Sequence, residues 1–334
     1  MTFNDWLPLL FAGLMGLAIL IYALLDGYDL GVGMLLPLGD GPQRDRMIAT
    51  IGPFWDANET WLVLAVGLLL IAFPAAHGMI LGQLYLPVLV LLVGLILRGV
   101  GFDFRTKVPA HRQYLWDSLL CVGSVLASLS QGYMLGLYVM GFERGIWSQV
   151  FAVLSAAGVT AAYVFIGSSW LLMKTSGLLQ QHTALWAQRS LWVMLLGIVS
   201  VSVVNPLVSD AVYRKWFSLP EAIVLLPIPL VCVVLMFGLH RFLQHFIRSG
   251  RSGGFDWLPF AGAVLIFILC FQGLAYSFYP YVVPFELTVW DAAAATESLT
   301  FVLWAVALVL PVIVVYTIAS YRVFWGKAEP LRYD

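Results

Sequence analysis

The chain of 334 residues consists mainly of long apolar runs separated by short polar segments. An α-helix rises 1.5 Å per residue, so about 20 apolar residues are needed to cross the ~30 Å hydrocarbon core of a bilayer. Nine runs are long enough, at approximately 8–35, 51–73, 78–100, 116–141, 149–173, 187–208, 220–247, 257–279 and 297–325. The sequence therefore predicts an all-α polytopic membrane protein with nine transmembrane helices.

The composition agrees with this prediction and excludes an ordinary soluble domain. Hydrophobic residues make up 61% of the chain and charged residues only 10%, whereas soluble domains contain roughly 25% charged residues. The net charge of −1 gives no indication of nucleic acid binding. Because the connections are short and no break in composition indicates a second unit, we expect residues 1–334 to form a single membrane-embedded domain.

The distribution of basic residues predicts the orientation of the chain. If the N-terminus lies outside, fourteen of the seventeen Lys and Arg residues fall on the inner side, and only Arg144, Arg214 and Lys215 fall outside. Inner segments of membrane proteins carry an excess of Lys and Arg. The first run lacks the basic region and cleavage site of a signal peptide, so we expect it to be a retained helix. We therefore predict an outer N-terminus and an inner C-terminus.

Acidic residues interrupt the first two apolar runs at helical spacing. Asp26 and Asp29 are three residues apart and share a helix face, as do Asp56 and Glu59. Asp26 lies nineteen residues after Leu7, or ~28 Å along a helix, which places it near the inner boundary of the membrane. A carboxylate in hydrocarbon costs ~2.5–3.5 kcal/mol on insertion scales, so such residues usually face the bundle interior and serve a function.

A third polar motif ends the next run, where Arg98 is followed by Asp103 and Arg105. Short loops join these three helices, so we expect them to be neighbours. Their charged side chains should then meet on one side of one bundle, as a group of five acids and two arginines: Asp26, Asp29, Asp56, Glu59, Asp103, Arg98 and Arg105. Such a group indicates a route for protons. The alternative is that these are solvated or capping charges at helix ends, which Pro53 near the start of the second run would suit.

No pattern in the sequence predicts a metal or heme site within this chain. A heme needs axial His, Met or Cys ligands at suitable depth. The histidines are expected in connections or at helix ends, with no two facing each other at mid-membrane: His77, His111, His182, His240 and His245. The three cysteines lie in apolar runs without CxxC spacing, which favours neither a disulfide framework nor zinc. If electrons pass through a complex of this chain, we expect another chain to carry them.

Three motifs in order resemble subunit II of the cytochrome bd-type quinol:oxygen oxidases. They are LDGYDLGVGM at 25–34, GPFWDANETWL at 52–62 and RGVGFDFR at 98–105, and Trp290-Asp291 with Ser298-Leu299-Thr300 match the end of the family pattern. The likeness covers essentially the whole chain. The compact loops are similar to the shorter, cyanide-insensitive branch of the family.

The resemblance implies two four-helix bundles plus one peripheral helix, in a multi-pass protein of the bacterial inner membrane. It implies a similarly folded partner, subunit I, which holds heme b and heme d and the site for the substrate quinol. Some members of the family carry a structural quinone in subunit II, and no motif here decides whether this chain does. A small single-helix accessory subunit and contacts with membrane lipid are also left open.

The resemblance further implies that subunit II supports heme assembly and supplies a cytoplasmic proton path. By position, Asp29 and Asp56 match the acids most associated with that path, and Asp26, Glu59, Arg98 and Asp103 surround them. Two alternatives remain. One is a proton-coupled secondary transporter, although binding residues in that class lie near the midplane rather than at one boundary. The other is a purely structural assembly subunit.

Overall fold

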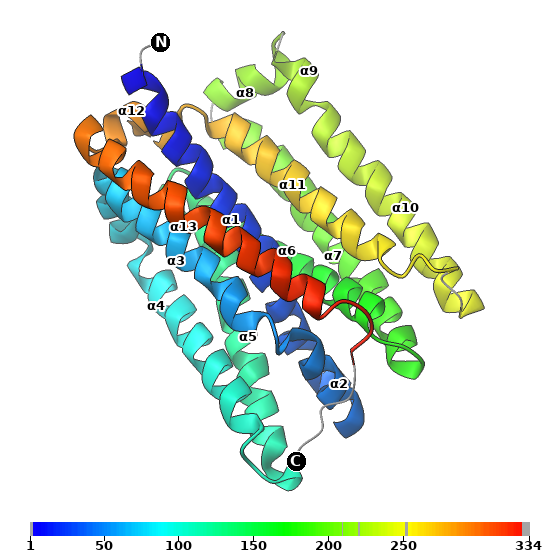
Figure 1. The fold of residues 1–334 in the computed structure, drawn as a ribbon. Coiled ribbons are helices and arrows are strands. Elements are labelled where there is room, and N and C mark those ends of the chain that lie inside the picture. Colours follow the sequence, from blue (N-terminus) through cyan, green and yellow to red (C-terminus); the bar gives the residue numbers. More distant parts are fainter. Residues whose placement is uncertain (1–2, 209, 220, 251–252, 329–334) are drawn as a thin grey trace.

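The fold was obtained as a computed structural model, which describes residues 3–208, 210–219, 221–250 and 253–328. Within these ranges nine helices are long and apolar enough to cross a membrane, which confirms the predicted number. They are α1 (Phe3–Leu35), α3 (Trp55–Ala72), α4 (Pro74–Arg105), α5 (Gln113–Val139), α6 (Ile146–Lys174), α7 (Leu178–Val208), α10 (Pro227–Ser249), α11 (Leu258–Phe278) and α13 (Thr296–Val323) (Figure 1). Arg251 and Arg332, two of the basic residues counted above, lie outside the described ranges.

Short elements connect the long helices. They are the 3-10 helices η1 (Leu36–Leu38) and η2 (Ala110–Arg112), the helices α2 (Gly41–Ile51), α8 (Asp210–Phe217), α9 (Ala222–Leu225) and α12 (Val289–Ala292), and the antiparallel strands β1 (Tyr281–Val283) and β2 (Leu287–Thr288). The two chain termini lie at opposite ends of the helix array (Figure 1). We call these ends the N-terminus end, which includes α8, α9 and the β-hairpin, and the C-terminus end, which includes α2 and η2.

Several helices extend beyond the apolar runs that predict them. α4 continues to Arg105, so Asp103 and Arg105 are helical rather than part of a loop, and α7 begins at Leu178, so His182 is helical as well. α3 begins at Trp55, four residues after the predicted start at 51, because α2 and a turn occupy the preceding residues. Polar residues can occupy the last turns of a helix that leaves the hydrocarbon, so hydropathy alone places helix ends poorly.

α1 lies at the centre of the array. It packs against α3, α5 and α6, whereas α4 packs along α5 and α5 along α6. On the other side of α6, the helices α7, α10 and α11 pack in turn, and α11 returns to contact α6. α1 is therefore the element from which side chains can reach both groups of helices.

Two glycines allow α1 and α6 to cross with their backbones in contact. A Cβ atom on Gly31 would lie 1.9 Å from the carbonyl oxygen of Tyr163, and one on Gly167 would lie 2.6 Å from the carbonyl carbon of Gly31. Small residues serve this purpose between membrane helices, where close packing replaces the hydrophobic effect as the main attraction. The crossing lies two residues beyond Asp29 and thus holds that part of α1 in place.

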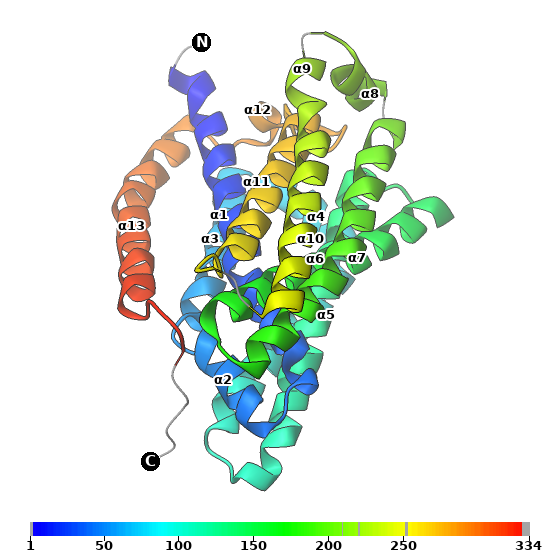
Figure 2. The ribbon, with the colours of Figure 1, turned by 90° about the vertical axis from the view of Figure 1, so that its right-hand side faces the viewer.

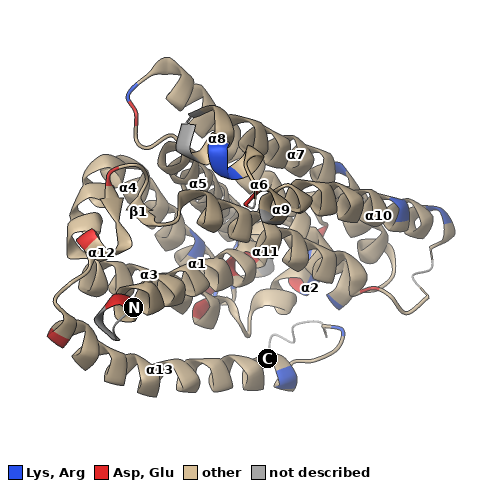
Figure 3. Ribbon diagram, turned by 90° about the horizontal axis from the view of Figure 1, so that it is seen from above, with Lys and Arg blue, Asp and Glu red and all other residues tan. Residues whose placement is uncertain are grey.

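α13 lies at one edge of the array (Figures 2 and 3). No residue in its most apolar window is buried within the chain. Its last turns are nevertheless attached to the C-terminus end, because Tyr321 stacks on Phe54 with ring centroids 4.4 Å apart. Beyond the helix, Lys174 Nζ donates to the carbonyl of Phe324 at 2.8 Å, and the Lys174 carbonyl accepts from the amide of Ala328 at 2.8 Å.

Gly31→Ala is expected to separate α1 from α6, because the added methyl group would meet a backbone carbonyl that cannot rotate away. The expected loss is about 3 kcal/mol, the upper end of the range for overpacking. It would be measured as a lower Tm and yield of the detergent-purified protein. Gly238→Ala in α10 is the matched control, since its Cβ would meet no atom within 4 Å. Equal stability of the two variants would contradict the close crossing.

Candidate functional site

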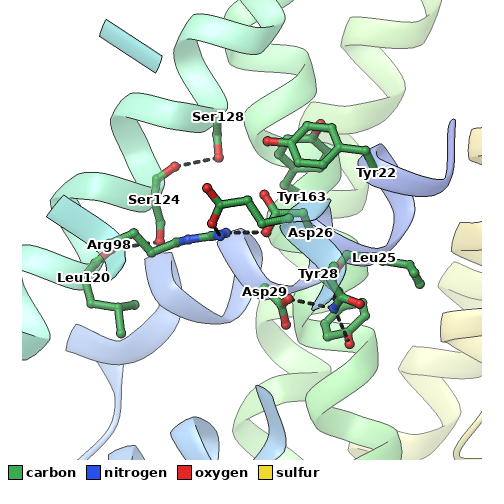
Figure 4. Close-up of polar contacts among 12 residues, drawn as sticks. Tyr22, Leu25, Asp26, Tyr28, Asp29, Arg98, Leu120, Ser124, Ser128 and Tyr163 are labelled. Atoms are coloured by element: carbon green, nitrogen blue, oxygen red, sulfur yellow. Dashed lines mark hydrogen bonds and ion pairs between the residues drawn. The ribbon is translucent and has the colours of Figure 1, made fainter. Parts of the chain in front are cut away.

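A buried arginine joins three helices near the C-terminus end. Arg98 on α4 donates through Nη1 to Asp26 on α1 and through Nη2 to Glu59 on α3, the latter at 2.7 Å (Figure 4). The side chains of Arg98 and Asp26 are 4% and 0% exposed, and that of Glu59 is 30% exposed. Since isolated charges are strongly disfavoured away from water, each of these groups depends on its partners.

Asp29 lies one turn further along α1 and has a different partner. Its Oδ2 accepts a hydrogen bond of 2.8 Å from Nδ2 of Asn58 on α3. Asp29 is 1% exposed, and Figure 4 shows it beside Tyr28. The same Asn58 nitrogen donates to the hydroxyl of Tyr28 at 2.9 Å, and Asn58 Oδ1 accepts from the hydroxyl of Tyr321 at 3.2 Å. The buried carboxylate of Asp29 is therefore held by a neutral amide rather than by a cation.

Some buried polar atoms between these groups have no hydrogen-bond partner among the described residues. They are Asp26 Oδ2, Asp29 Oδ1 and Arg98 Nε. A small cavity lies beside them, with about 10 Å³ of space for the centre of a water molecule and a lining of Asp29, Ile51, Trp55, Arg98, Phe102 and Leu120. This is room for about one water, and Asp29 and Arg98 are the two polar residues in an otherwise apolar lining. A water there would have these two residues as its polar partners.

A second charged cluster lies closer to the C-terminus end. Arg105 on α4 donates to Asp117 on α5 at 2.5 Å and to Asp45 on α2 at 2.7 Å, and Arg44 approaches Asp117 at 3.5 Å. Arg105 is 1% exposed. This cluster fixes α2 and α5 to the end of α4. Asp45, Asp117 and Arg44 were missed from the sequence, although the position of Asp117 inside an apolar run indicates a paired carboxylate.

The prediction that five acids and two arginines form one group is wrong. Asp26, Glu59 and Arg98 do meet, with Asp29 beside them, but Arg105 belongs to the second cluster and Asp56 and Asp103 are exposed. Helix geometry explains why Arg105 and Asp103 do not join Arg98: Arg105 lies on nearly the same face of α4 but about 10 Å further along it, whereas Asp103 lies on another face. At about 100° per residue, Asp103 is rotated roughly 140° from Arg98 and faces away from it.

Sequence reasoning also missed Tyr28, Asn58 and Tyr321 as members of the site. Tyr28 and Asn58 lie within the first two polar motifs, but their side chains are neutral and do not interrupt the apolar runs with a charge as the adjacent acids do. Tyr321 is separated from Asn58 by 263 residues, and no local pattern distinguishes it from other tyrosines at helix ends. It could be found only from the packing of α13.

The described residues contain no group of three or more His, Cys, Asp or Glu side chains that could hold a metal ion. Two of the histidines contact tryptophan rings, His182 that of Trp186 and His240 that of Trp192. The expectation that another chain holds the hemes stays a prediction.

Comparison with known proteins relates the whole chain to one family. A profile described as "Cytochrome bd terminal oxidase subunit II" matches residues 7–324. "Cytochrome bd-I ubiquinol oxidase subunit 2" of Escherichia coli strain K12 is 28% identical, over 94% of this chain and 93% of the relative. "Cytochrome bd ubiquinol oxidase subunit 2" of Bacillus subtilis strain 168 is 29% identical, over 92% and 94%.

A solved structure shares the fold. A chain of the bd oxidase from Geobacillus thermodenitrificans superposes with a TM-score of 0.72, covering 96% of this chain and 99% of that chain at 16% sequence identity. At this level of identity the likeness concerns the fold alone.

Arg98→Ala is expected to prevent stable folding, because it leaves the Asp26 carboxylate buried without a cation. Removing one partner of a buried pair costs about 3–5 kcal/mol. The measurement is the amount of chain recovered as a single species by size-exclusion chromatography of a detergent extract. Arg112→Ala, at an exposed position, is the control. The double variant Arg98→Gln with Asp26→Asn removes both charges, so the amount of chain recovered as a single species should partly return. A normal amount of recovered chain in Arg98→Ala alone would contradict the role of the pair.

Proposed function

This chain belongs to the cytochrome bd terminal oxidase subunit II family, and we propose that its buried acidic network takes up protons for the reduction of oxygen. The chain is a multi-pass membrane subunit of a terminal quinol oxidase in respiratory electron transport. The complex is an oxidoreductase that contains hemes, uses quinol and includes a partner, subunit I.

We propose that residues 1–334 form one membrane-embedded domain of two four-helix bundles and one peripheral helix. The first bundle would consist of α1, α3, α4 and α5, and the second of α6, α7, α10 and α11. The contacts among these helices support this division, since each bundle closes on itself and α1 and α5 join the first bundle to α6. α13, with its unburied apolar surface, would be the peripheral helix.

We propose that the N-terminus end faces the outside of the bacterial inner membrane and the C-terminus end faces the cytoplasm. The excess of Lys and Arg in the connections at the C-terminus end supports this orientation. Both charged clusters would then lie toward the cytoplasmic boundary. A path that starts there would draw protons from the cytoplasm.

Heme b, heme d and the quinol site are assigned to subunit I in this proposal. When bound, those hemes supply the redox chemistry that reduces oxygen to water. The family resemblance and the positions of the histidines in the sequence, in connections or at helix ends, support their placement in the partner. A structural quinone, a single-helix accessory subunit and specific lipid contacts stay predictions from the family resemblance.

Asp29 is the residue to which we assign the transfer of protons, and its burial without a cationic partner carries the proposal. Asp26 is held in an ion pair by Arg98, whereas the side chain of Asp29 accepts its hydrogen bond, among the described residues, from the neutral amide of Asn58. A carboxylate outside an ion pair can change its charge without breaking one. Its second oxygen has no hydrogen-bond partner within the described part of the chain, and the residue lines the water-sized cavity, so a water there would deliver the proton.

The other acids have supporting roles in this proposal. Asp56 and Asp103 are exposed and would attract protons near the start of the path. Glu59, which is partly exposed, would connect that surface to the buried Arg98 and Asp26. Quinol oxidation in the partner would release protons on the outer side, while oxygen reduction would take protons from the cytoplasm. The reaction would therefore separate charge across the membrane without a pumping cycle.

A purely structural subunit is the second candidate function, and the interhelical ion pairs of Arg98 and Arg105 favour it. Such a subunit would need the pairs for assembly but would not need Asp29 to exchange a proton. A secondary transporter is less well supported, because the buried acids lie near one end of the helices rather than at the midplane. A heme absorption spectrum of the complex purified through this chain separates the oxidase from the transporter.

Asp29→Asn is expected to slow quinol-driven oxygen uptake by roughly tenfold or more, since the amide cannot accept and release a proton. Heme content should stay normal, because Asn has the same shape and leaves the Arg98 pairs intact. Oxygen uptake is measured with an oxygen electrode and normalised to heme absorbance. Glu143→Gln, an exposed position at the N-terminus end, is the control. Unchanged turnover in a normally assembled Asp29→Asn oxidase would remove Asp29 from the path and favour the structural role.

The orientation is tested by labelling introduced cysteines. A membrane-impermeant maleimide should modify Arg144→Cys in intact spheroplasts, and Arg112→Cys only in inside-out vesicles, since these exposed positions lie at opposite ends of the helices. The native cysteines lie in membrane helices and provide the background measurement. The reverse pattern would overturn the proposed orientation and, with it, the cytoplasmic source of protons.

A further inference from the structure

The helices α7 and α10 lie side by side and run in opposite directions, and two contacts give their alignment. The ring centroids of Trp192 and His240 are 4.9 Å apart. Closer to the C-terminus end, a Cβ atom on Gly250, which follows α10, would lie 3.7 Å from Nε2 of Gln181 on α7. Between the two contacts the chain advances by eleven residues on α7 and by ten on α10. The helices therefore stay in register over this length.

This register brings arginines of the two helices to one level. Arg189 lies three residues beyond Trp192 in the direction of the C-terminus end, and Arg241 lies one residue beyond His240. At 1.5 Å per residue, their positions along the helices differ by about 3 Å. Both arginines are exposed. Arg248, which is also exposed, lies two turns further along α10 on the same face as Arg241.

No carboxylate on the neighbouring helices balances these arginines. The sequences of α6, α7, α10 and α11 contain no Asp or Glu. The ion pairs in the described part of the chain do not include Arg189, Arg241 or Arg248. Asp256, shortly before α11, is paired with Lys327 at 2.7 Å. The three arginines are therefore open to an anion from outside the chain.

The arginines also mark the level at which the exposed apolar surface ends. On the side of the N-terminus end, α7 exposes Trp192 and Leu196 at 51% and 59%, and α10 exposes Phe237 at 56%. From Arg241 to the end of α10, the exposed positions are all polar. The guanidinium carbon of Arg241 lies 5.0 Å from the centre of the Phe237 ring, at the edge of the apolar surface. This is the level at which phospholipid headgroups meet the hydrocarbon.

We propose that Arg189 and Arg241 bind a phosphate group of an anionic phospholipid, with an acyl chain lying along Trp192 and Phe237. A guanidinium presents a rigid fork of donors that matches phosphate, and basic sites between membrane helices suit anionic headgroups. Arg248 lies about 10 Å further along α10 and extends the site toward a second phosphate. The lipid class that supplies two phosphates is cardiolipin. This inference goes beyond the proposed function and does not depend on Asp29.

The test uses the purified oxidase complex after partial removal of its lipid, with native mass spectrometry to follow binding of added cardiolipin. Arg189→Gln combined with Arg241→Gln should weaken the tightest binding by roughly twentyfold to thirtyfold, and each single substitution by about fivefold. Arg46→Gln combined with Arg112→Gln is the matched control, because it removes two exposed arginines at the same end of the array, from α2 and η2. The control should bind cardiolipin as the original complex does.

Two further probes define the chemistry of the ligand. Phosphatidylethanolamine, which has one phosphate and no net charge, should bind the original complex more weakly than cardiolipin, and the α7 and α10 substitutions should reduce this difference. Inorganic phosphate should not displace bound cardiolipin, because it lacks the acyl chains that contact Trp192 and Phe237.

Three results would overturn the inference. Equal cardiolipin binding in the α7 and α10 variants and in the control would place the bound lipid elsewhere. Displacement of cardiolipin by inorganic phosphate would indicate a site for free anions. Loss of subunit I from the α7 and α10 variants, with cardiolipin binding unchanged, would assign the arginines to a protein contact. Normal turnover in Asp29→Asn would reject the proton path and leave this site unaffected.

Discussion

The ion pairs of Arg98 are the interaction on which the rest of the site depends. One guanidinium bridges a carboxylate on α1 and another on α3, and loss of the guanidinium would leave the fully buried Asp26 carboxylate without its cation. Because the planar guanidinium presents several donors in a rigid fork, it can hold both partners at once. The pairs thus bring three helices to one point and also set the charge balance there.

That balance leaves Asp29 in a distinct position. Arg98 is engaged by Asp26 and Glu59, and one oxygen of the neighbouring Asp29 accepts from the amide of Asn58 instead. The close crossing of α1 and α6 at Gly31 restricts how far α1 could shift to relieve this arrangement. The same features that stabilise the bundle therefore leave one buried carboxylate outside an ion pair, beside a cavity of about the size of a water, and the proposed function builds on this carboxylate.

The sequence was sufficient to predict the helices and the meeting of Asp26, Glu59 and Arg98, because hydropathy and helical spacing are local properties. It was not sufficient for Asp103, whose orientation depends on α4 remaining helical past its apolar run. Nor could the sequence identify Tyr321, since no periodicity links the end of α13 to the start of α3. Residues at the same depth in the membrane need not touch each other. Contact also depends on how each helix is rotated about its own axis, and the sequence does not give that rotation.

The choice of side chain at position 58 follows from these contacts. The site requires one group that donates to Asp29 and Tyr28 on one edge and accepts from Tyr321 on the other. An aspartate there would add a further carboxylate against Asp29, and a lysine or alanine would remove the acceptor that Tyr321 uses at position 58. The asparagine amide carries two N–H donors and a carbonyl acceptor in one plane. It can therefore connect the edge of the helix array to the buried acid without adding charge.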